Sequence, residues 1–251
     1  MKTILNINKG TLAVIITMTA ITLIGFSIAW VYYGNINNAE DPRIIEAKIM
    51  YKSYNSFVET GSYDNGLLLL DSIADIYQKY DDYKNSYEMG VVLNNKAAIY
   101  LTMALALKEG SEKEALLEIA DVNVKQSIII YENWLADFSK LTNAEIRLKV
   151  EPIYNNSNYN FDSDLTAAYI DKRTSDIELS QRETIRRLSV SYTNLGIVFR
   201  NRNEIEQALN NYKKAIDLWS KNLTAENNIN LILGRPLKEL STLERLFPDK
   251  K

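Results

Sequence analysis

The chain has 251 residues and a formal net charge of −3 at pH 7, from 29 Lys and Arg against 32 Asp and Glu residues. Hydrophobic residues make up 46% and charged residues 24% of the sequence, as in an ordinary globular protein, which excludes wholesale disorder. The charge balance argues against nucleic acid as a partner, because neutralising phosphates needs a basic surplus. Since the chain has no His and no Cys, imidazole bases, thiol nucleophiles, disulfides and His/Cys zinc sites are excluded.

A segment without charged side chains, residues 11–34, follows a short N-terminal tail of residues 1–10. As a helix it would be about 35 Å long, slightly more than the bilayer core of about 30 Å. Trp30, Tyr32 and Tyr33 stand at its end, where aromatic side chains meet lipid headgroups. The segment is therefore predicted to be a transmembrane helix that anchors the chain in a lipid bilayer.

A cleaved leader is the alternative for the same segment. Ser27 and Ala29 fit a cleavage site, and Lys2 and Lys9 fit a basic n-region, but the apolar run is longer than the h-region of about 7–15 residues. The uncleaved anchor is therefore favoured. The two lysines before the span also predict a cytoplasmic N-terminus and an extracytoplasmic domain of residues 35–251.

After Asp41, apolar residues recur at three- and four-residue spacing, and the chain has only 9 Gly and 4 Pro residues. Both features favour helices over turn-rich β structure. Asp41 is expected to cap the first helix, with Pro42 after it. The predicted fold class is all-α, with helices over about 44–57, 67–80, 82–108, 112–139, 164–203, 204–221, 225–233 and 236–246.

Residues 192–220 place aromatic and small side chains at fixed offsets: Tyr192, Leu195, Gly196, Phe199, Ala208, Tyr212 and Ala215. This spacing resembles the tetratricopeptide repeat, a helix-turn-helix unit of about 34 residues, and the resemblance is best over residues 189–222. Ser220 departs from it, because the family usually has a helix-ending proline there. The resemblance implies that residues 35–251 form a short α-solenoid of antiparallel helix pairs, in which small residues let the backbones approach.

Two weaker copies of the repeat lie upstream, within residues 45–131. The first runs from Met50 to Ile73. The second places its helix crossing at Ala97 and Ala120, which are 23 residues apart, against the 12 residues between Gly196 and Ala208. Residues 132–188 match no repeat, and a generic all-α bundle with one chance motif stays as the alternative.

Candidate chemistry is sparse. Asp162-Ser163-Asp164 would suit a divalent cation, but a helix cap is the favoured interpretation. Asp81-Asp82 is interpreted as a solvated turn, and the basic stretch 172–202 as the solvent-exposed face of a helix. The sequence contains no phosphate-binding glycine loop and no hydrolase motif. No cofactor or metal is therefore predicted.

Tetratricopeptide domains bind peptides or partner proteins and have no catalytic chemistry of their own. The resemblance therefore implies a membrane-anchored protein–protein interaction or scaffold module, with a protein or peptide as partner and no nucleic acid. A secreted solute- or lipid-binding helical domain is the alternative, and an enzyme without a recognisable motif is less favoured. The residues predicted to contact the partner, on the first helix of each repeat, are Tyr51, Asn55, Asn94, Leu101, Thr193, Ile197, Arg200 and Asn201.

Overall fold

The computed structural model describes residues 39–156, 159 and 161–239, together with Met18 and Thr22. In this part of the chain the fold is all-α, without β-strands. The helices after residue 40 are α2 (Ile45–Glu59), α3 (Tyr63–Gln78), α4 (Asp81–Lys84), α5 (Tyr87–Ala106), α6 (Ser111–Phe138), α7 (Asn143–Tyr154), α8 (Thr166–Asn201), α9 (Ile205–Leu218) and α10 (Leu223–Ile232).

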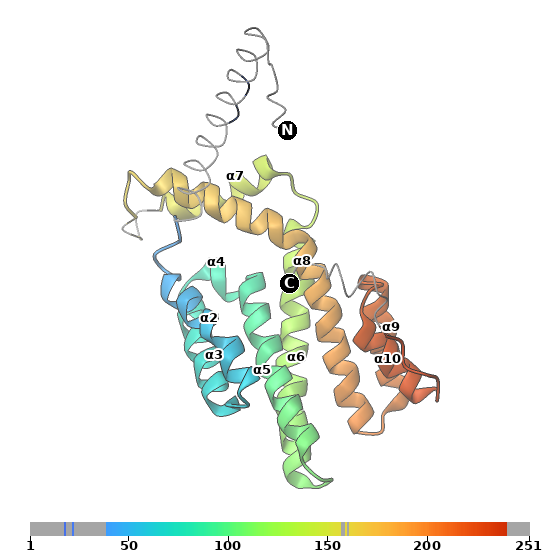
Figure 1. The fold of residues 1–251 in the computed structure, drawn as a ribbon. Helices are drawn as coiled ribbons and strands as arrows, with labels where there is room; N and C mark the ends of the chain where they lie inside the picture. The colour runs from blue at the N-terminus through green and yellow to red at the C-terminus, as the bar shows by residue number, and fades with distance from the viewer. Residues whose placement is uncertain (1–17, 19–21, 23–38, 157–158, 160, 240–251) are drawn as a thin grey trace, which may run out of the picture.

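Antiparallel helix pairs stand side by side in chain order (Figure 1). α2 pairs with α3, α5 with α6, and the second half of α8 with α9, while α3 packs on α5 and α6 on α8. The 36-residue helix α8 changes direction near its middle, so that its first half lies with α7 as a separate layer across one end of α5 and α6 (Figure 1). We call α7 and the first half of α8 the end layer.

Several helix ends use local signals that the sequence carries. α2, α8 and α10 are each followed by a residue with positive φ, respectively Gly61, Asn203 and Gly234. At each end, the next N–H donates back to a carbonyl five residues earlier at 2.8 Å, which is the Schellman arrangement. α7 begins with a capping box, in which Thr142 and Glu145 satisfy each other's backbone N–H. The ends of α2 and α8 thus fix the turns of the α2–α3 and α8–α9 hairpins.

Two helix pairs share one kind of close crossing. A Cβ atom added to Gly196 would lie 2.5 Å from the ring of Tyr212, and one added to Gly90 would lie 2.5 Å from the ring of Tyr131. Both tyrosines are fully buried. On α5, small residues recur every seven positions (Gly90, Ala97, Ala104), and on α6 large residues do the same (Leu117, Val124, Tyr131). All six are buried, as expected for an antiparallel pair with a seven-residue packing repeat.

The second predicted repeat therefore needs correction. Ala97 packs with Val124 and Tyr131, whereas Ala120 belongs to a different cluster with Leu101, Ala104, Leu117 and Val198. The residue that corresponds to Gly196 is Gly90. The predicted pairing of Ala97 with Ala120 failed because α6, with 28 residues, is twice as long as the 14-residue helix α9 of the best repeat, so the offsets of that repeat do not transfer to it.

Other helix boundaries also differ from the prediction. The cap position of α2 is Ile44 and not Asp41; Asp41 lies one turn earlier, where its carboxylate accepts from the backbone N–H of Arg43 at 2.9 Å in the turn that leads into α2. Pro152 lies inside α7, a helix that the sequence analysis left within unassigned residues. Residues 235–239 are not helical, and the rest of the helix expected over 236–246 lies outside the described residues.

The predicted anchor, residues 11–34, also lies outside the described residues except for two. Met18 and Thr22 are helical and exposed, and the Thr22 hydroxyl donates to the Met18 carbonyl at 2.8 Å. In the described part of the chain, α5 is long and apolar enough to cross a membrane. Half of its apolar stretch is buried between neighbouring helices, so this helix also fits the core of the domain, and its apolarity is weak evidence for a membrane span.

Candidate functional site

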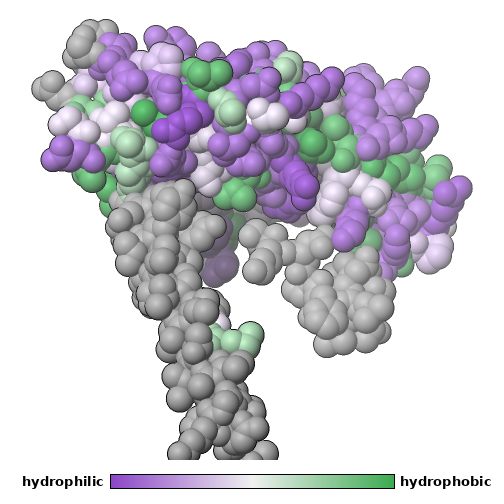
Figure 2. All heavy atoms as spheres, turned by 90° about the horizontal axis from the view of Figure 1, so that it is seen from above, coloured by the Kyte–Doolittle hydropathy of each residue, from purple (hydrophilic) through white to green (hydrophobic). Residues whose placement is uncertain are grey.

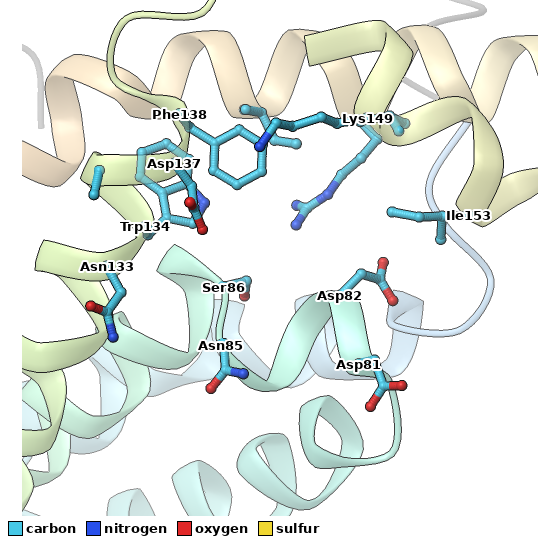
Figure 3. A pocket seen from close by; sticks show the side chains of 14 residues that line it. Asp81, Asp82, Asn85, Ser86, Asn133, Trp134, Asp137, Phe138, Lys149 and Ile153 are labelled. Carbon is cyan, nitrogen blue, oxygen red and sulfur yellow. The ribbon is translucent and has the colours of Figure 1, made fainter. Parts of the chain in front are cut away.

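A cleft of about 570 Å³ lies between the end layer and the ends of the hairpins beneath it. Figure 3 shows its walls: α4 and the start of α5 on one side, the end of α6 on a second, and α7 opposite. The labelled side chains that line it are Asp81, Asp82, Asn85, Ser86, Asn133, Trp134, Asp137, Phe138, Lys149 and Ile153. The volume lies within the range of about 300–1,000 Å³ that is usual for ligand sites.

One wall of the cleft is held by Arg43. Its guanidinium forms two bidentate contacts, with Asp82 at 3.0 and 2.8 Å and with Asp41 at 2.7–3.1 Å. Asp41 also accepts hydrogen bonds from the hydroxyls of Tyr83, at 3.0 Å, and Tyr154, at 2.7 Å. Burial opposes ionisation of Asp41, but Arg43 and Tyr154 outweigh burial, and the pKa of Asp41 lies below its usual value. We call Asp41, Arg43 and Asp82 the arginine clamp.

Aromatic rings surround the guanidinium of Arg43. Its central carbon lies within 5.4 Å of the ring centroids of Tyr80, Tyr83, Tyr154, Tyr159 and Phe161. Rings at this distance stabilise a cation electrostatically. Arg43 and Asp41 keep only 5% and 4% of their side-chain surface exposed, while Asp82, on the cleft side, keeps 14%. The clamp thus joins the segment before α2 to α4 and to the end layer.

Arg173 is a second buried arginine, on α8, and it also lines the cleft. Only 5% of its surface is exposed, and its Nη1 donates to Glu88 of α5. Burial disfavours the charge, but Glu88 raises the pKa of Arg173, so this side chain stays cationic. The sequence analysis interpreted this basic stretch as a solvent-exposed face, which is wrong for Arg173. Asp82, expected in a solvated turn, is likewise part of a mostly buried ion pair.

Besides Asp81, which is paired with Lys84, the mouth of the cleft presents one charged side chain of each sign. Asp137 and Lys149 are exposed, and no ion pair joins either of them to another described residue. The Lys149 ammonium lies 5.1 Å from the ring centroid of Phe138, which itself stacks on Trp134. Deeper in the cleft, Ser86 is only 3% exposed and its hydroxyl has no hydrogen-bond partner among the described residues. The cleft therefore offers a donor, an acceptor and an aromatic wall.

Within the described residues, no group of three or more carboxylates could hold a metal ion. At the Asp162–Asp164 turn, a carboxylate oxygen of Asp162 accepts from the backbone N–H of Asp164, and α8 starts two residues later. This is local turn chemistry before a helix, close to the cap that was predicted.

Three of the predicted partner-contact residues are buried inside the domain. Asn94 accepts hydrogen bonds from Ser191 Oγ at 2.9 Å and from Asn194 at 3.0 Å, so it joins α5 to α8. Thr193 accepts from Asn222, the cap of α10, at 2.9 Å. Leu101 packs in the cluster of α5, α6 and α8. In this conformation these three side chains hold helices together and do not reach a partner.

The other predicted residues lie at separate places. Tyr51 lines a smaller hollow of about 200 Å³ with Tyr77 and Tyr87, and its hydroxyl accepts from Asn95 at 2.7 Å. The others are Asn55, exposed on α2, Ile197 and Asn201, half-buried on α8, and Arg200, which donates to Asn228 at 2.5 Å. They do not line one groove, and partner contact by these five residues stays a prediction.

Sequence reasoning missed the cleft. Its residues come from α4, from the link between α4 and α5, and from α6, α7 and α8, and all of them fall in the unassigned stretch 132–188 or in the turn at 81–86. The one usable signal was the alternation of charged and aromatic residues around Trp134 and Phe138.

Compared with protein-family models, with curated proteins and with solved structures, the chain matches none of them. The resemblance of residues 189–222 to a tetratricopeptide unit therefore stays a prediction carried by its own residues.

The tyrosine hydroxyls provide a test of these contacts. Tyr212 Oη is buried without a partner among the described residues, whereas Tyr154 Oη donates to Asp41. We expect Tyr212→Phe to leave the free energy of unfolding unchanged or to raise it by about 1 kcal/mol, and Tyr154→Phe to lower it by about 1.5–3 kcal/mol. Chemical unfolding of both variants, followed by circular dichroism, checks this. Equal losses would show that Tyr212 has a partner.

Proposed function

We propose that this chain is a membrane-anchored protein-interaction module. In this proposal residues 11–34 form a single transmembrane helix with a cytoplasmic N-terminus, and residues 35–251 form a short, extracytoplasmic solenoid similar to tetratricopeptide domains. The row of helix pairs and the matching crossings at Gly90 and Gly196 support solenoid packing. The basic residues Lys2 and Lys9 support the orientation.

The main support for a binding function is the cleft beneath the end layer. Asp137 and Lys149 give its mouth both signs of charge, and Trp134 and Phe138 give it an apolar wall. A segment of a partner protein that combines an apolar side chain with charged neighbours fits this surface, because aromatic anchors supply affinity and rim charges supply orientation. The buried arginines keep the cleft walls in place without offering a nucleophile or a base.

A photo-cross-linking experiment tests the proposal on the full-length protein in its membrane. A photoreactive residue at Lys149 should give an adduct with a defined protein, and the same residue at Lys52, exposed on α2 outside the cleft, should not. Asp137→Lys should lower the adduct at least tenfold, which corresponds to about 1.4 kcal/mol of binding energy. Asp75→Lys, an equally exposed charge reversal on α3, should leave it unchanged. Equal adducts at both positions would contradict the proposal.

A second candidate function is supported by Ser86. A hydroxyl that is buried without a partner beside an arginine suits a small polar solute, and this corresponds to a secreted solute-binding domain released by cleavage of the leader. Mass spectrometry of small molecules released on denaturing the purified protein decides between the two. A compound that is retained by the native protein and lost in Ser86→Ala would favour the solute; a cross-linked protein without such a compound favours the interaction module.

A further inference from the structure

The chain enters the domain through the end layer. Ala39 is buried against α7 and α8, in the cluster that contains Ile146 and Ile170, and Asp41 follows in the arginine clamp. Residues 39–44 then run from the end layer to the start of α2 (Figure 1). From Ala39 onward the backbone is therefore fixed to the end layer.

Only residues 35–38 separate Ala39 from the uncharged segment that ends at Gly34. Five Cα steps span at most about 18 Å. The headgroup region on each side of a bilayer core is about 5–8 Å thick. If residues 11–34 cross the membrane, the end layer must lie at the headgroups or within one short linker of them.

The hairpins run away from this end. α6 has 28 residues and is therefore about 42 Å long, and the end layer crosses only one end of it (Figure 1). The turn between α5 and α6, at residues 107–110, lies at the opposite end. The end layer is thus the membrane-proximal side of the domain and the α5–α6 turn is the distal side.

The outward face of the end layer carries large apolar side chains. Leu148 on α7 is 69% exposed and Leu179 on α8 is 73% exposed. Leu148 lies opposite the buried positions Ile146 and Val150 on its helix. Figure 2, a view onto this end, shows a mainly hydrophilic surface with hydrophobic side chains scattered over it.

Charge does not favour acidic lipids here. Residues 143–154 and 162–182 contain seven acidic and five basic side chains. Several of these are paired within the layer, for example Arg147 with Asp171 and Lys172 with Asp176. A surface without a basic excess gains little from anionic headgroups.

We infer that the outward face of α7 and of the first half of α8 lies against the lipid headgroups, with Leu148 and Leu179 in contact with the bilayer boundary. The contact is apolar, so zwitterionic lipid suffices. This inference rests on the proposed membrane anchor, and it adds the surface that the domain turns toward the membrane. The cleft then opens beside the membrane, where its partner would have to approach.

Because the chain has no cysteine, single cysteines can be labelled cleanly. An environment-sensitive fluorophore is attached at Leu148→Cys, Leu179→Cys, Leu105→Cys or Ala20→Cys in the full-length protein, reconstituted in phosphatidylcholine vesicles that carry a lipid-borne quencher. Leu105, 49% exposed near the α5–α6 turn, is the distal control. We expect quenching at positions 148 and 179 that is severalfold stronger than at position 105, and unchanged when phosphatidylserine is added.

The position in the apolar segment separates the two possible failures. Quenching at position 20, with positions 148 and 179 no more quenched than 105, would overturn the headgroup contact and leave the anchor standing. Absence of quenching at position 20 would overturn the anchor and the contact together. Quenching at 148 and 179 that requires phosphatidylserine would also overturn the inference, because the contact would then depend on charge.

Discussion

Replacing Arg43 by leucine is expected to lower the free energy of unfolding by about 3–5 kcal/mol, because removing one partner of a buried ion pair leaves the other charge uncompensated. Here two carboxylates, Asp41 and Asp82, would lose their cation together. The Asp41 side chain is only 4% exposed, so water would compensate little of its charge, whereas Asp82 lines the cleft and is 14% exposed. In a domain of this size the loss corresponds to a fall of about 6–20 °C in the melting temperature. A circular dichroism melt of the full-length protein in detergent measures it.

Arg147→Leu is the matched control. Arg147 also contacts two carboxylates, Glu151 and Asp171, but its side chain is 38% exposed, and exposed ion pairs contribute about 0–1 kcal/mol. Arg43→Lys keeps the positive charge but loses the planar guanidinium group that contacts both carboxylates. The melting temperature of this variant should therefore lie between those of wild type and Arg43→Leu. A similar small loss for Arg43→Leu and Arg147→Leu would show that water reaches the clamp.

The helical character of the chain was predictable because the apolar spacing is local. The long helices α5, α6, α8 and α9 were placed to within about five residues, although the helix expected over 82–108 is divided into α4 and α5 at Asn85 and Ser86. α7 was missed because its buried positions, among them Ile146, Val150 and Tyr154, form a short stripe in a polar segment that contains a proline. No proline or glycine marks the position at which α8 changes direction, so the sequence does not indicate it. The change depends on packing of α8 against two different sets of helices.

The site was much less predictable. Asp41 was predicted as a helix cap and Asp82 as part of a solvated turn, and Arg43 was assigned no role at all; only the tertiary fold brings residues 41 positions apart into one buried cluster. Conversely, Asn94 and Thr193 read as outward positions because the repeat resemblance assumes a free concave face. In the structure, α8 and α10 cover those positions, and the polar side chains bond to one another across helices.

Substituting the crossing glycines tests which helix pairs pack closely. Propensity alone favours alanine over glycine in a helix by about 1 kcal/mol, so Gly→Ala should stabilise a helix that has room for the methyl group. At Gly196 and Gly90 the new Cβ would lie 2.5 Å from the ring of a fully buried tyrosine. An aromatic ring in a packed core cannot yield as a flexible chain end does, and overpacking costs about 1–3 kcal/mol or more. Both variants should therefore be less stable than wild type.

Gly66→Ala supplies the control, because Gly66 is also buried in a helix but its nearest neighbour is the end of a flexible side chain, Ile99 Cδ1, at 3.2 Å. We expect its free energy of unfolding to stay within about 1 kcal/mol of wild type.

A double-mutant cycle tests the contact between Gly196 and Tyr212 directly. Tyr212→Leu should make Gly196→Ala less costly than in the wild type, since the smaller side chain leaves space for the methyl group. Additive losses in that cycle, or an equal loss at Gly66, would mean that the Gly196–Tyr212 contact does not set the spacing of α8 and α9. Non-additive losses would make this contact, and by the same geometry Gly90–Tyr131, the feature that holds adjacent helices at one distance along the row.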